Sequence, residues 1–190
     1  MRDKRRIGFA MCGSYCTYEK AFAAAERLTE DYELVPILSE TAAHTDTRFG
    51  TAAENVRRLE EITGARVICS IADAEPLGPK VPLDALIIAP CTGCTLAKLA
   101  HGVTDTAVTM AAKAHLRNGR PLVLAFSTND GLSGSAESIA VLLNRRNVYF
   151  VPFSQDAPET KPRSLQSDFA LLPDALAAAL SGRQLQPILR

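Results

Sequence analysis

Short, mostly apolar runs alternate with segments of helical periodicity along the chain. Such runs, when bounded by polar or turn residues, are typical of strands covered on both faces of a parallel sheet. The strands expected on this pattern are residues 6–12, 33–38, 66–70, 83–89, 121–126 and 148–151. The expected helices are residues 18–28, 51–63, 95–101, 104–116, 135–143 and 168–180. Because strands and helices alternate, the sequence predicts an α/β fold, a single-domain, doubly wound, Rossmann-like parallel sheet over residues 1–190.

The stretch 83–105 contains the most informative connection between a strand and a helix. Its apolar run stops at Pro90, which is expected to end ladder pairing and turn the chain. Residues 91–95 are expected to form a loop of small side chains, and the helical pattern begins at Thr95 and stops at Gly102. Ligands of open α/β sheets bind where strands end, and the N–H groups at a helix start attract phosphate or carboxylate. The stretch therefore predicts an anion-binding loop.

Hydroxyl-bearing residues also follow the first two expected strands. Gly13 and Ser14 come after the first strand, and Ser39 and Thr41 come after the second. Gly8 and Gly13 do not have the GxGxxG spacing, so the Gly13–Ser14 pair is either a phosphate loop or only a turn with a helix cap. Because the carboxyl ends of parallel strands meet at one edge of a sheet, we expect these hydroxyls to converge with those of the loop at 92–95.

Composition narrows the range of partners. The chain has 190 residues with 21 Lys and Arg against 21 Asp and Glu, so its net charge is zero. Proteins that bind nucleic acid usually carry an excess of positive charge, and this composition gives no indication of such binding. No apolar run approaches the roughly 18 residues of a membrane span, and the basic start is not followed by a signal-peptide core. We therefore expect a cytoplasmic protein that binds small molecules, without nucleic acid or membrane.

The five cysteines are an odd number, which argues against a secreted disulfide framework. Cys91 and Cys94 have the CxxC spacing, which suits a redox pair, half of a zinc site, or simply small loop residues. A zinc site needs four ligands, and the sequence has neither a second CxxC nor an HxxxH motif. No metal site is therefore expected.

The loop APCTGCTLAKLA at residues 89–100 resembles the motif AP-x-[ST]-x-N-T-x-A-K-x-A of the flavoprotein family, whose members include homo-oligomeric, flavin-binding decarboxylases. Gly13 and Ser14 match the first flavin loop of that family. The resemblance implies the flavoprotein fold, flavin mononucleotide (FMN) as cofactor and a homo-oligomer built from trimers. The cofactor-binding residues expected are Gly13, Ser14, Ser39, Thr41, Thr92, Gly93, Cys94 and Thr95. Alanine-rich helix faces at 21–25 and 107–114 are expected to permit close packing across the oligomer interface.

Longer segments resemble one branch of this family over nearly the full length of the chain. These segments are RIGFAMCGSYCTYEK, TDTRFG, AEPLGPKVPLD, AAKAHLRNGRP, STNDGL, NVYFVPFSQDAPETKP and GRQLQP. The branch implies an oxidoreductase subunit that helps to oxidise a dihydropyridine dicarboxylate to pyridine-2,6-dicarboxylate during sporulation, with NADP held by a partner subunit. In that interpretation the chain either carries FMN or uses the old flavin pocket for substrate. The alternatives are a non-catalytic scaffold subunit and a flavin-dependent decarboxylase.

Two departures from the family pattern bear on the chemistry. Cys94 stands where the family motif has Asn, so any contact made by that Asn is lost or replaced. The decarboxylases also carry a His before the AP strand, and residues 78–83 (GPKVPL) have none, which disfavours decarboxylation. His44 either stands in for it from another loop or is solvated.

The implied substrate is a dianion, and planar carboxylates favour the fork geometry of Arg. Arg48 is the first candidate, with an ordinary surface arginine as the alternative. Asn129 matches the Asn of the family motif that meets a substrate carboxylate. Lys98 is expected one turn into its helix, where its charge opposes the helix dipole, so a functional or packing role competes with simple solvation. The catalytic residues are not identified by these patterns.

Overall fold

The computed structural model describes residues 4–78 and 80–190 and contains a seven-stranded sheet in the order β2-β1-β3-β4-β7-β6, with β5 also paired to β4. Its strands are β1 (Arg6–Met11), β2 (Glu33–Leu38), β3 (Ala85–Cys91), β4 (Leu122–Thr128), β5 (Val148–Phe150), β6 (Phe153–Ser154) and β7 (Leu165–Ser167). The first five strands are joined by parallel pairing, whereas β7 is antiparallel to both β4 and β6. The predicted α/β class is confirmed, with a mostly parallel sheet.

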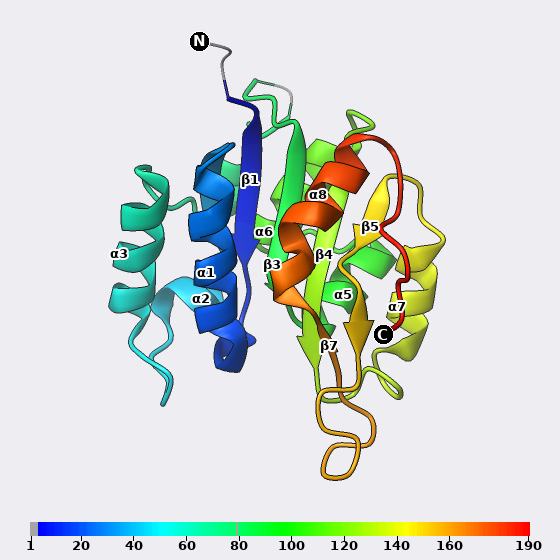
Figure 1. Ribbon diagram of the computed structural model, residues 1–190. Coiled ribbons are helices and arrows are strands. Elements are labelled where there is room, and N and C mark those ends of the chain that lie inside the picture. The colour runs from blue at the N-terminus through cyan, green and yellow to red at the C-terminus, as the bar shows by residue number, and fades with distance from the viewer. Residues whose placement is uncertain (1–3, 79) are drawn as a thin grey trace.

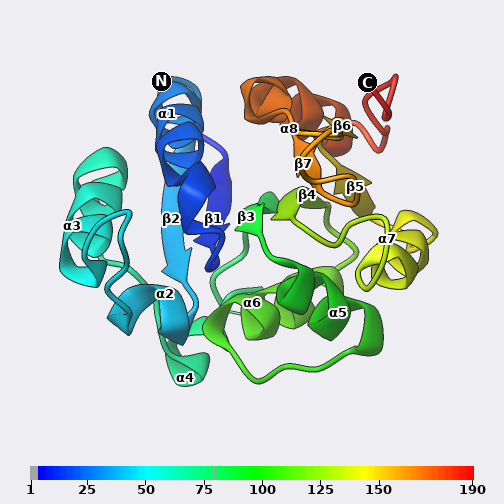
Figure 2. The same cartoon turned by 90° about the horizontal axis from the view of Figure 1, so that it is seen from below.

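Helices cover both faces of the sheet. They are α1 (Tyr18–Thr29), α2 (Glu40–His44), α3 (Ala52–Thr63), α4 (Ile71–Ala74), α5 (Gly93–His101), α6 (Ala107–Leu116), α7 (Ala136–Leu143) and α8 (Leu172–Leu180), with short 3-10 turns at Tyr15–Thr17 and Phe169–Leu171. Figures 1 and 2 show α1 and α8 on one face, with α3 beside α1, and α5, α6 and α7 on the other. Each strand of the sheet's centre is therefore enclosed between two helical layers.

This enclosure explains the continuous apolar runs. In β3, Ile88 packs toward the α5–α7 layer, while its neighbour Ile87 packs toward the α1 and α8 layer. Leu124 and Val123 of β4 divide between the same two cores. Because both faces of these strands are buried, a polar side chain on either face would lose its contact with water. The strands therefore consist almost entirely of apolar residues.

The alanine-rich helix faces belong to these cores. Ala21 and Ala25 of α1, and Ala107 and Ala111 of α6, all have 0% exposed surface in the chain alone. Small side chains let both helices approach the sheet closely. The predicted role of these alanines in an oligomer interface is therefore wrong, because they already pack against their own sheet.

Pro90 does not end its strand as predicted. The Ala89–Pro90 peptide is cis, and after an irregularity in register Cys91 still pairs with Phe126 of β4. Proline is tolerated at such an irregularity because the missing N–H has no partner there. Its carbonyl accepts a hydrogen bond from the N–H of Cys12 at 3.0 Å, which joins the end of β3 to the end of β1.

The segment 66–70 is not the predicted strand. It makes a single parallel bridge, Ile68 to Ile37, and Ser70 then caps α4 by accepting a hydrogen bond from the N–H of Asp73. The pairing cannot extend because the chain turns at once into that short helix. The sequence analysis also missed α2, α4, β6 and β7, all of which are too short to show a periodic pattern.

Local signals placed most helix ends correctly. Thr51 and Glu54 form a reciprocal capping box at the start of α3, and Gly64 ends the helix with φ of 67°. Gly102 ends α5 in the same left-handed conformation, with φ of 72°. The cap of α6 is Thr106, however, so this helix begins later than the expected residue 104.

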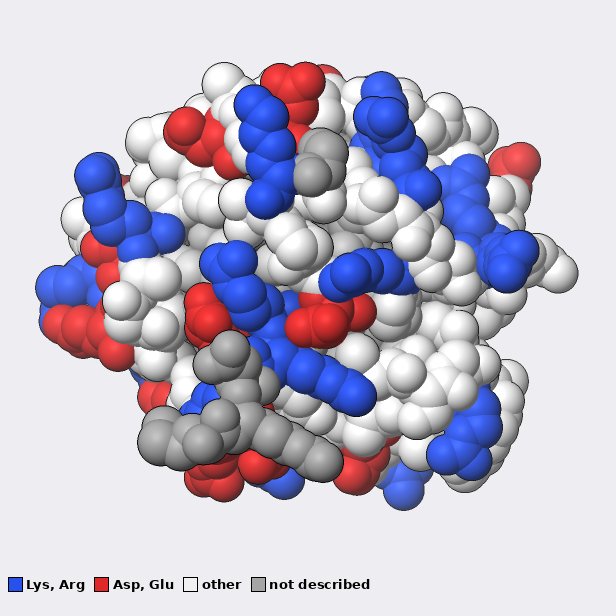
Figure 3. Space-filling view, turned by 90° about the horizontal axis from the view of Figure 1, so that it is seen from above, with Lys and Arg blue, Asp and Glu red and all other residues white. Residues whose placement is uncertain are grey.

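The amino ends of the strands carry charges of both signs. Figure 3 shows this end of the molecule with basic and acidic side chains interspersed. Arg6 pairs with Glu33 at 3.0 Å, and Arg120 lies 3.6 Å from Asp84.

In the residues that the structure describes, no helix is long and apolar enough to cross a membrane.

The buried His115 predicts a dependence of stability on pH. Its side chain is fully buried, Nε2 bonds the carbonyl of Pro121 at 2.9 Å, and Nδ1 has no partner in the described residues. Burial lowers the pKa of His115, and nearby Arg120 lowers it further, while the bond to Pro121 and the charge of Asp84 oppose the shift. Below the ordinary His pKa of about 6.5 the unfolded chain therefore binds a proton that the folded chain does not, so stability falls on acidification.

We expect the urea midpoint of the wild type to fall between pH 7.5 and 5.5 by more than that of His115→Gln, which cannot titrate. His44 and His101, both exposed, remain in both proteins and serve as the internal reference. Equal pH dependence of the two midpoints would show that His115 does not contribute.

Candidate functional site

The loops that follow β1, β2, β3 and β4 meet at the carboxyl edge of the sheet, the side seen in Figure 2. The N–H of Ser39, after β2, donates to the carbonyl of Met11 at 3.1 Å. The hydroxyl of Ser14, after β1, donates to the carbonyl of Ser127 in β4 at 2.9 Å. Hydrogen bonds thus join the ends of β1 and β2, which are neighbours, and the ends of β1 and β4, which are separated by β3. The predicted hydroxyl residues therefore follow strands that end at the same edge of the sheet.

Thr92 and Thr95 form the start of α5 and not a separate loop. Thr92 is the N-cap, and its side-chain oxygen accepts a hydrogen bond from the N–H of Thr95 at 3.1 Å. The two hydroxyl oxygens are 3.0 Å apart and hydrogen-bonded. The expected loop at 91–95 is therefore corrected: Cys91 still belongs to β3, and Gly93, Cys94 and Thr95 are the first helical residues, because the small side chain of Thr92 supplies the cap.

Ser39 and Thr41 lie in a short helix that the sequence analysis did not expect. Ser39 caps α2 by accepting a hydrogen bond from the N–H of Ala42 at 3.2 Å, and its side chain is largely buried. Thr41 is exposed, and its carbonyl accepts a hydrogen bond from the hydroxyl of Tyr15 at 3.3 Å. The loops after β1 and β2 are therefore in direct contact.

Backbone donors at this edge are available to an anion. Among the described residues, the N–H groups of Gly13, Ser14, Gly93 and Cys94 donate no hydrogen bond to the backbone. The last two point from the start of α5, where the helix dipole favours negative charge. These four N–H groups fit the phosphate of a cofactor such as FMN. The hydroxyls of Ser14 and Thr92 belong to the same turns but already donate to Ser127 and Thr95.

Gly93 has a packing role that the motif alone did not indicate. A Cβ at this position would lie 2.5 Å from Oγ of Ser135, 2.8 Å from Oγ1 of Thr128 and 3.2 Å from Oδ1 of Asp130. The Asp130 carboxylate accepts hydrogen bonds from both hydroxyls, at 2.8 Å from Ser135, and these bonds lower the pKa of Asp130. Sequence reasoning missed this cluster, although the polar run after residue 126 was its signal.

The cysteines near this edge differ in environment. Burial raises the pKa of the Cys12 thiol to about 11, despite an opposing hydrogen bond with the side chain of Thr95, and burial also raises the pKa of Cys91. Cys94 is exposed, and all five cysteines are free. Cys12 and Cys91 are therefore protonated at neutral pH and unsuited to act as thiolate nucleophiles. In the described part of the chain, no group of three or more His, Cys, Asp and Glu is arranged to hold a metal ion.

The two predicted substrate residues lie in different loops. Arg48 is exposed in the α2–α3 loop, and its guanidinium carbon lies 4.9 Å from the ring centre of the exposed Phe49. Asn129 is exposed in the turn between β4 and α7. Figure 2 shows these loops on opposite sides of the ends of β1 and β3. One chain therefore does not bring Arg48 and Asn129 together.

Lys98 and His44 do not contribute to the gathered site. Because α5 begins at Gly93 and ends at His101, Lys98 is in its last turn, where a cation complements the helix dipole. The expected conflict with the dipole is wrong, and Lys98 forms an ion pair with Asp105 at 2.9 Å. His44 is exposed at the end of α2.

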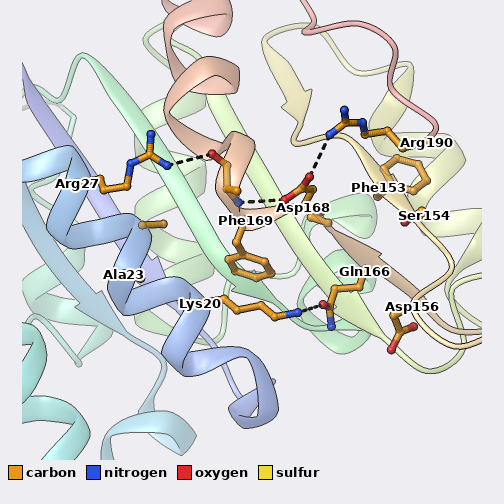
Figure 4. Close-up of a pocket in the computed structure, with 13 residues that line it drawn as sticks. Lys20, Ala23, Arg27, Phe153, Ser154, Asp156, Gln166, Asp168, Phe169 and Arg190 are labelled. Carbon is orange, nitrogen blue, oxygen red and sulfur yellow. Dashed lines mark hydrogen bonds and ion pairs between the residues drawn. The ribbon is translucent and has the colours of Figure 1, made fainter.

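A groove beside α1 adds a feature that the sequence analysis missed. Its volume is about 800 Å³, and it lies between α1 and the segments around β6, β7 and the start of α8 (Figure 4). The Lys20 ammonium donates to Oε1 of Gln166 at 2.6 Å, and Nε2 of Gln166 donates to Oγ of Ser127 at 3.3 Å. Ser127 also bonds Ser14, so the groove adjoins the carboxyl-edge site through these side chains.

Comparison with known proteins agrees with this architecture. The family model described as Flavoprotein matches residues 1–155. The dipicolinate synthase B subunit of Bacillus subtilis (strain 168) is 48% identical over 186 residues, which are 97% of this chain and 93% of that protein. The crystal structure of the dipicolinate synthase B subunit from Bacillus halodurans superposes with a TM-score of 0.91 at 42% identity, covering 99% of this chain and 97% of that one.

A more distant structure shares the fold. The dodecameric FMN-dependent UbiX-like decarboxylase from Escherichia coli O157:H7 has a TM-score of 0.62 at 25% identity, over 77% of this chain and 79% of that one. The matches to the two Bacillus proteins cover nearly the whole chain, and the family match covers most of it. The chain belongs to the flavoprotein family, in the branch of the dipicolinate synthase B subunits.

Proposed function

We propose that this chain acts as the B subunit of a dipicolinate synthase, which together with an A subunit oxidises a dihydrodipicolinate-type precursor to pyridine-2,6-dicarboxylate. The observation that carries the proposal is the 48% identity with the B. subtilis protein over 97% of the chain. The proposed setting is the cytoplasm of the mother cell of a sporulating bacterium. The A subunit supplies the NADP-binding domain, since this chain has no GxGxxG motif after its first strand.

FMN is the cofactor proposed for the carboxyl-edge site. The free N–H groups of Gly13, Ser14, Gly93 and Cys94, with the nearby hydroxyls, support binding of its phosphate. Ser39, Thr41, Thr92 and Thr95 complete the proposed set. Bound flavin would supply a hydride acceptor for a ring that becomes aromatic. The task of the chain's own residues is to hold the phosphate and to keep the first turn of α5 in place.

Substrate binding is proposed to use Arg48 and Asn129. Both side chains are exposed, and Arg48 has no acidic partner among the described residues. A homo-oligomer based on trimers is proposed as well, because two loops that are separated within one chain can meet across a contact between copies. In this arrangement Arg48 of one copy would approach the strand ends of the next.

A second candidate is a subunit that binds substrate, and not flavin, at the same edge. Cys94 favours it, because the exposed thiol replaces the amide that the family motif places there. A flavin-dependent decarboxylase is less well supported, since residues 78–83 lack the family histidine and the exposed His44 is at the end of α2.

The absorption spectrum tests the cofactor. We expect purified chain that is incubated with FMN and then dialysed free of unbound flavin to keep the absorption bands of flavin. Ser14→Ala should weaken FMN binding about tenfold. The Ser14 hydroxyl, which donates to the carbonyl of Ser127 in the structure, would turn to donate a charge-assisted hydrogen bond to the bound phosphate, and alanine cannot make that bond. Ser181→Ala, at the exposed end of α8, is the matched control and should bind FMN like the wild type.

Failure of the wild type to retain flavin, combined with binding of pyridine-2,6-dicarboxylate, would favour the second candidate. An assay of precursor oxidation with and without the A subunit tests the function itself. Activity of the A subunit that is unchanged by adding this chain would contradict the proposed role and favour a scaffold.

A further inference from the structure

The structure has a basic groove on the face of the sheet covered by α5, α6 and α7. Its volume is about 420 Å³. The basic groove is defined by the five basic side chains among its lining residues, Lys98, Lys113, Arg117, Arg145 and Arg146, and none of the described Asp or Glu residues lines it. The chain as a whole has equal numbers of basic and acidic residues. The excess of positive charge is therefore local to the groove and is not found in the chain as a whole.

One arginine of the basic groove is held in place by hydrogen bonds. The guanidinium of Arg145 donates to the carbonyl of Leu99 at 2.7 Å and to that of Ala100 at 3.2 Å. These carbonyls are at the carboxyl end of α5, where a cation is favourable. Arg145 is therefore held in place by α5 and keeps the end of α7 against it.

Three other cations of the groove are free to meet a partner. Lys113, Arg117 and Arg146 are exposed and make no ion pair with any residue in the described ranges. Lys98, by contrast, is neutralised by Asp105. Clustered like charges repel one another, and an acidic partner would convert that repulsion into attraction.

Apolar side chains lie between these charges. Val103 is 43% exposed, although it is a large aliphatic residue, and Leu99 and Leu116 line the groove beside it. An aliphatic contact ringed by charges is the usual anatomy of a protein–protein contact. No aromatic side chain from residues 4–78 or 80–190 lines the groove, so bases would find no stacking surface there, which disfavours single-stranded nucleic acid.

We propose that the basic groove docks an acidic segment of the A subunit, with an aliphatic side chain of that segment on Val103 and its carboxylates on Arg117 and Arg146. The identity of the partner rests on the proposed function, whereas its acidic and aliphatic character follows from the groove itself. Because α5 extends from the groove to Gly93 and Thr95 at the carboxyl edge, the docked partner would contact the same helix that forms part of the cofactor site.

Charge substitutions on the full chain test the proposal by surface plasmon resonance against immobilised A subunit. We expect Arg117→Glu/Arg146→Glu to weaken the complex about tenfold or more, mainly by slowing association, and to reduce its dependence on salt. Arg117→Gln/Arg146→Gln removes the same charges without placing an acid at the end of α6, and it should show a smaller loss in the same direction. Arg66→Glu/Arg183→Glu changes two exposed cations elsewhere by the same total charge and should bind within about twofold of wild type.

The possible results separate the two proposals. If the wild type binds the A subunit and both groove variants bind it equally well, the groove is not the docking site. The proposed function would be unaffected by that result. Equal weakening by the control variant would also overturn it, because only net charge would then matter. A wild type that does not bind the A subunit at all would contradict the two-subunit function. Loss of self-association in the groove variants, with unchanged binding of the A subunit, would assign the groove to a second copy of this chain.

Discussion

Replacing Gly93 by valine is expected to lower the free energy of unfolding by about 3 kcal/mol, the upper end of the usual cost of overpacking. The added Cβ would meet Oγ of Ser135 at 2.5 Å and Oγ1 of Thr128 at 2.8 Å. Neither atom is the end of a long flexible side chain, and both are held by Asp130. The first turn of α5 would have to move away from β4 and α7. The measurement is the urea unfolding curve, with Gly93→Ala expected to show a smaller change in the same direction.

Gly13→Ala is the matched control, since it alters the other glycine of the proposed cofactor site. A Cβ there would meet only the ring of Tyr15, at 3.5 Å, and the backbone of Gly13 does not have positive φ. Its stability should stay within about 0.5 kcal/mol of wild type. If Gly93→Val were as stable as Gly13→Ala, the close packing of α5 against Ser135 and Thr128 would not constrain the fold.

Replacing Arg48 by alanine is expected to raise the apparent Michaelis constant for the dihydrodipicolinate substrate by about 30- to 150-fold in the reconstituted complex. This range corresponds to about 2–3 kcal/mol for the loss of a charge-assisted fork contact to a carboxylate. Arg48→Lys should recover only part of the loss, because an ammonium cannot make the bidentate contact. Thermal stability should change little, since the side chain is exposed and contacts mainly the exposed ring of Phe49.

Arg66→Ala provides the control, because it removes an exposed arginine beyond the end of α3. Unchanged kinetics of Arg48→Ala in an intact complex would make Arg48 an ordinary surface residue. Slower turnover together with weaker association of the subunits would instead place Arg48 at an interface. The second outcome is informative because Arg48 and Asn129 are in loops on opposite sides of the strand ends.

The local sequence determined most of the regular structure of this protein. The strand at 33–38 and the helix that ends at Gly64 are as expected, because their signals are carried by neighbouring residues: an apolar run in one case, a capping box and a left-handed glycine in the other. The gathering of Ser14, Ser39 and Thr92 at one edge also followed from the sequence, since parallel strands all end on the same side.

Features that depend on distant segments were decided only by the tertiary structure. β7 is three residues long and exists because Leu165 and Gln166 find partners in Thr128 and Ser127. The effect of the helix dipole on Lys98 was predicted wrongly because α5 starts at Gly93, after its cap at Thr92, and not at the expected Thr95. The packing around Gly93, the burial of the alanine faces and the basic groove were likewise invisible in the sequence. Each depends on side chains that are far apart in the chain and become neighbours only when the sheet and its two helical layers assemble, so no local pattern could indicate them.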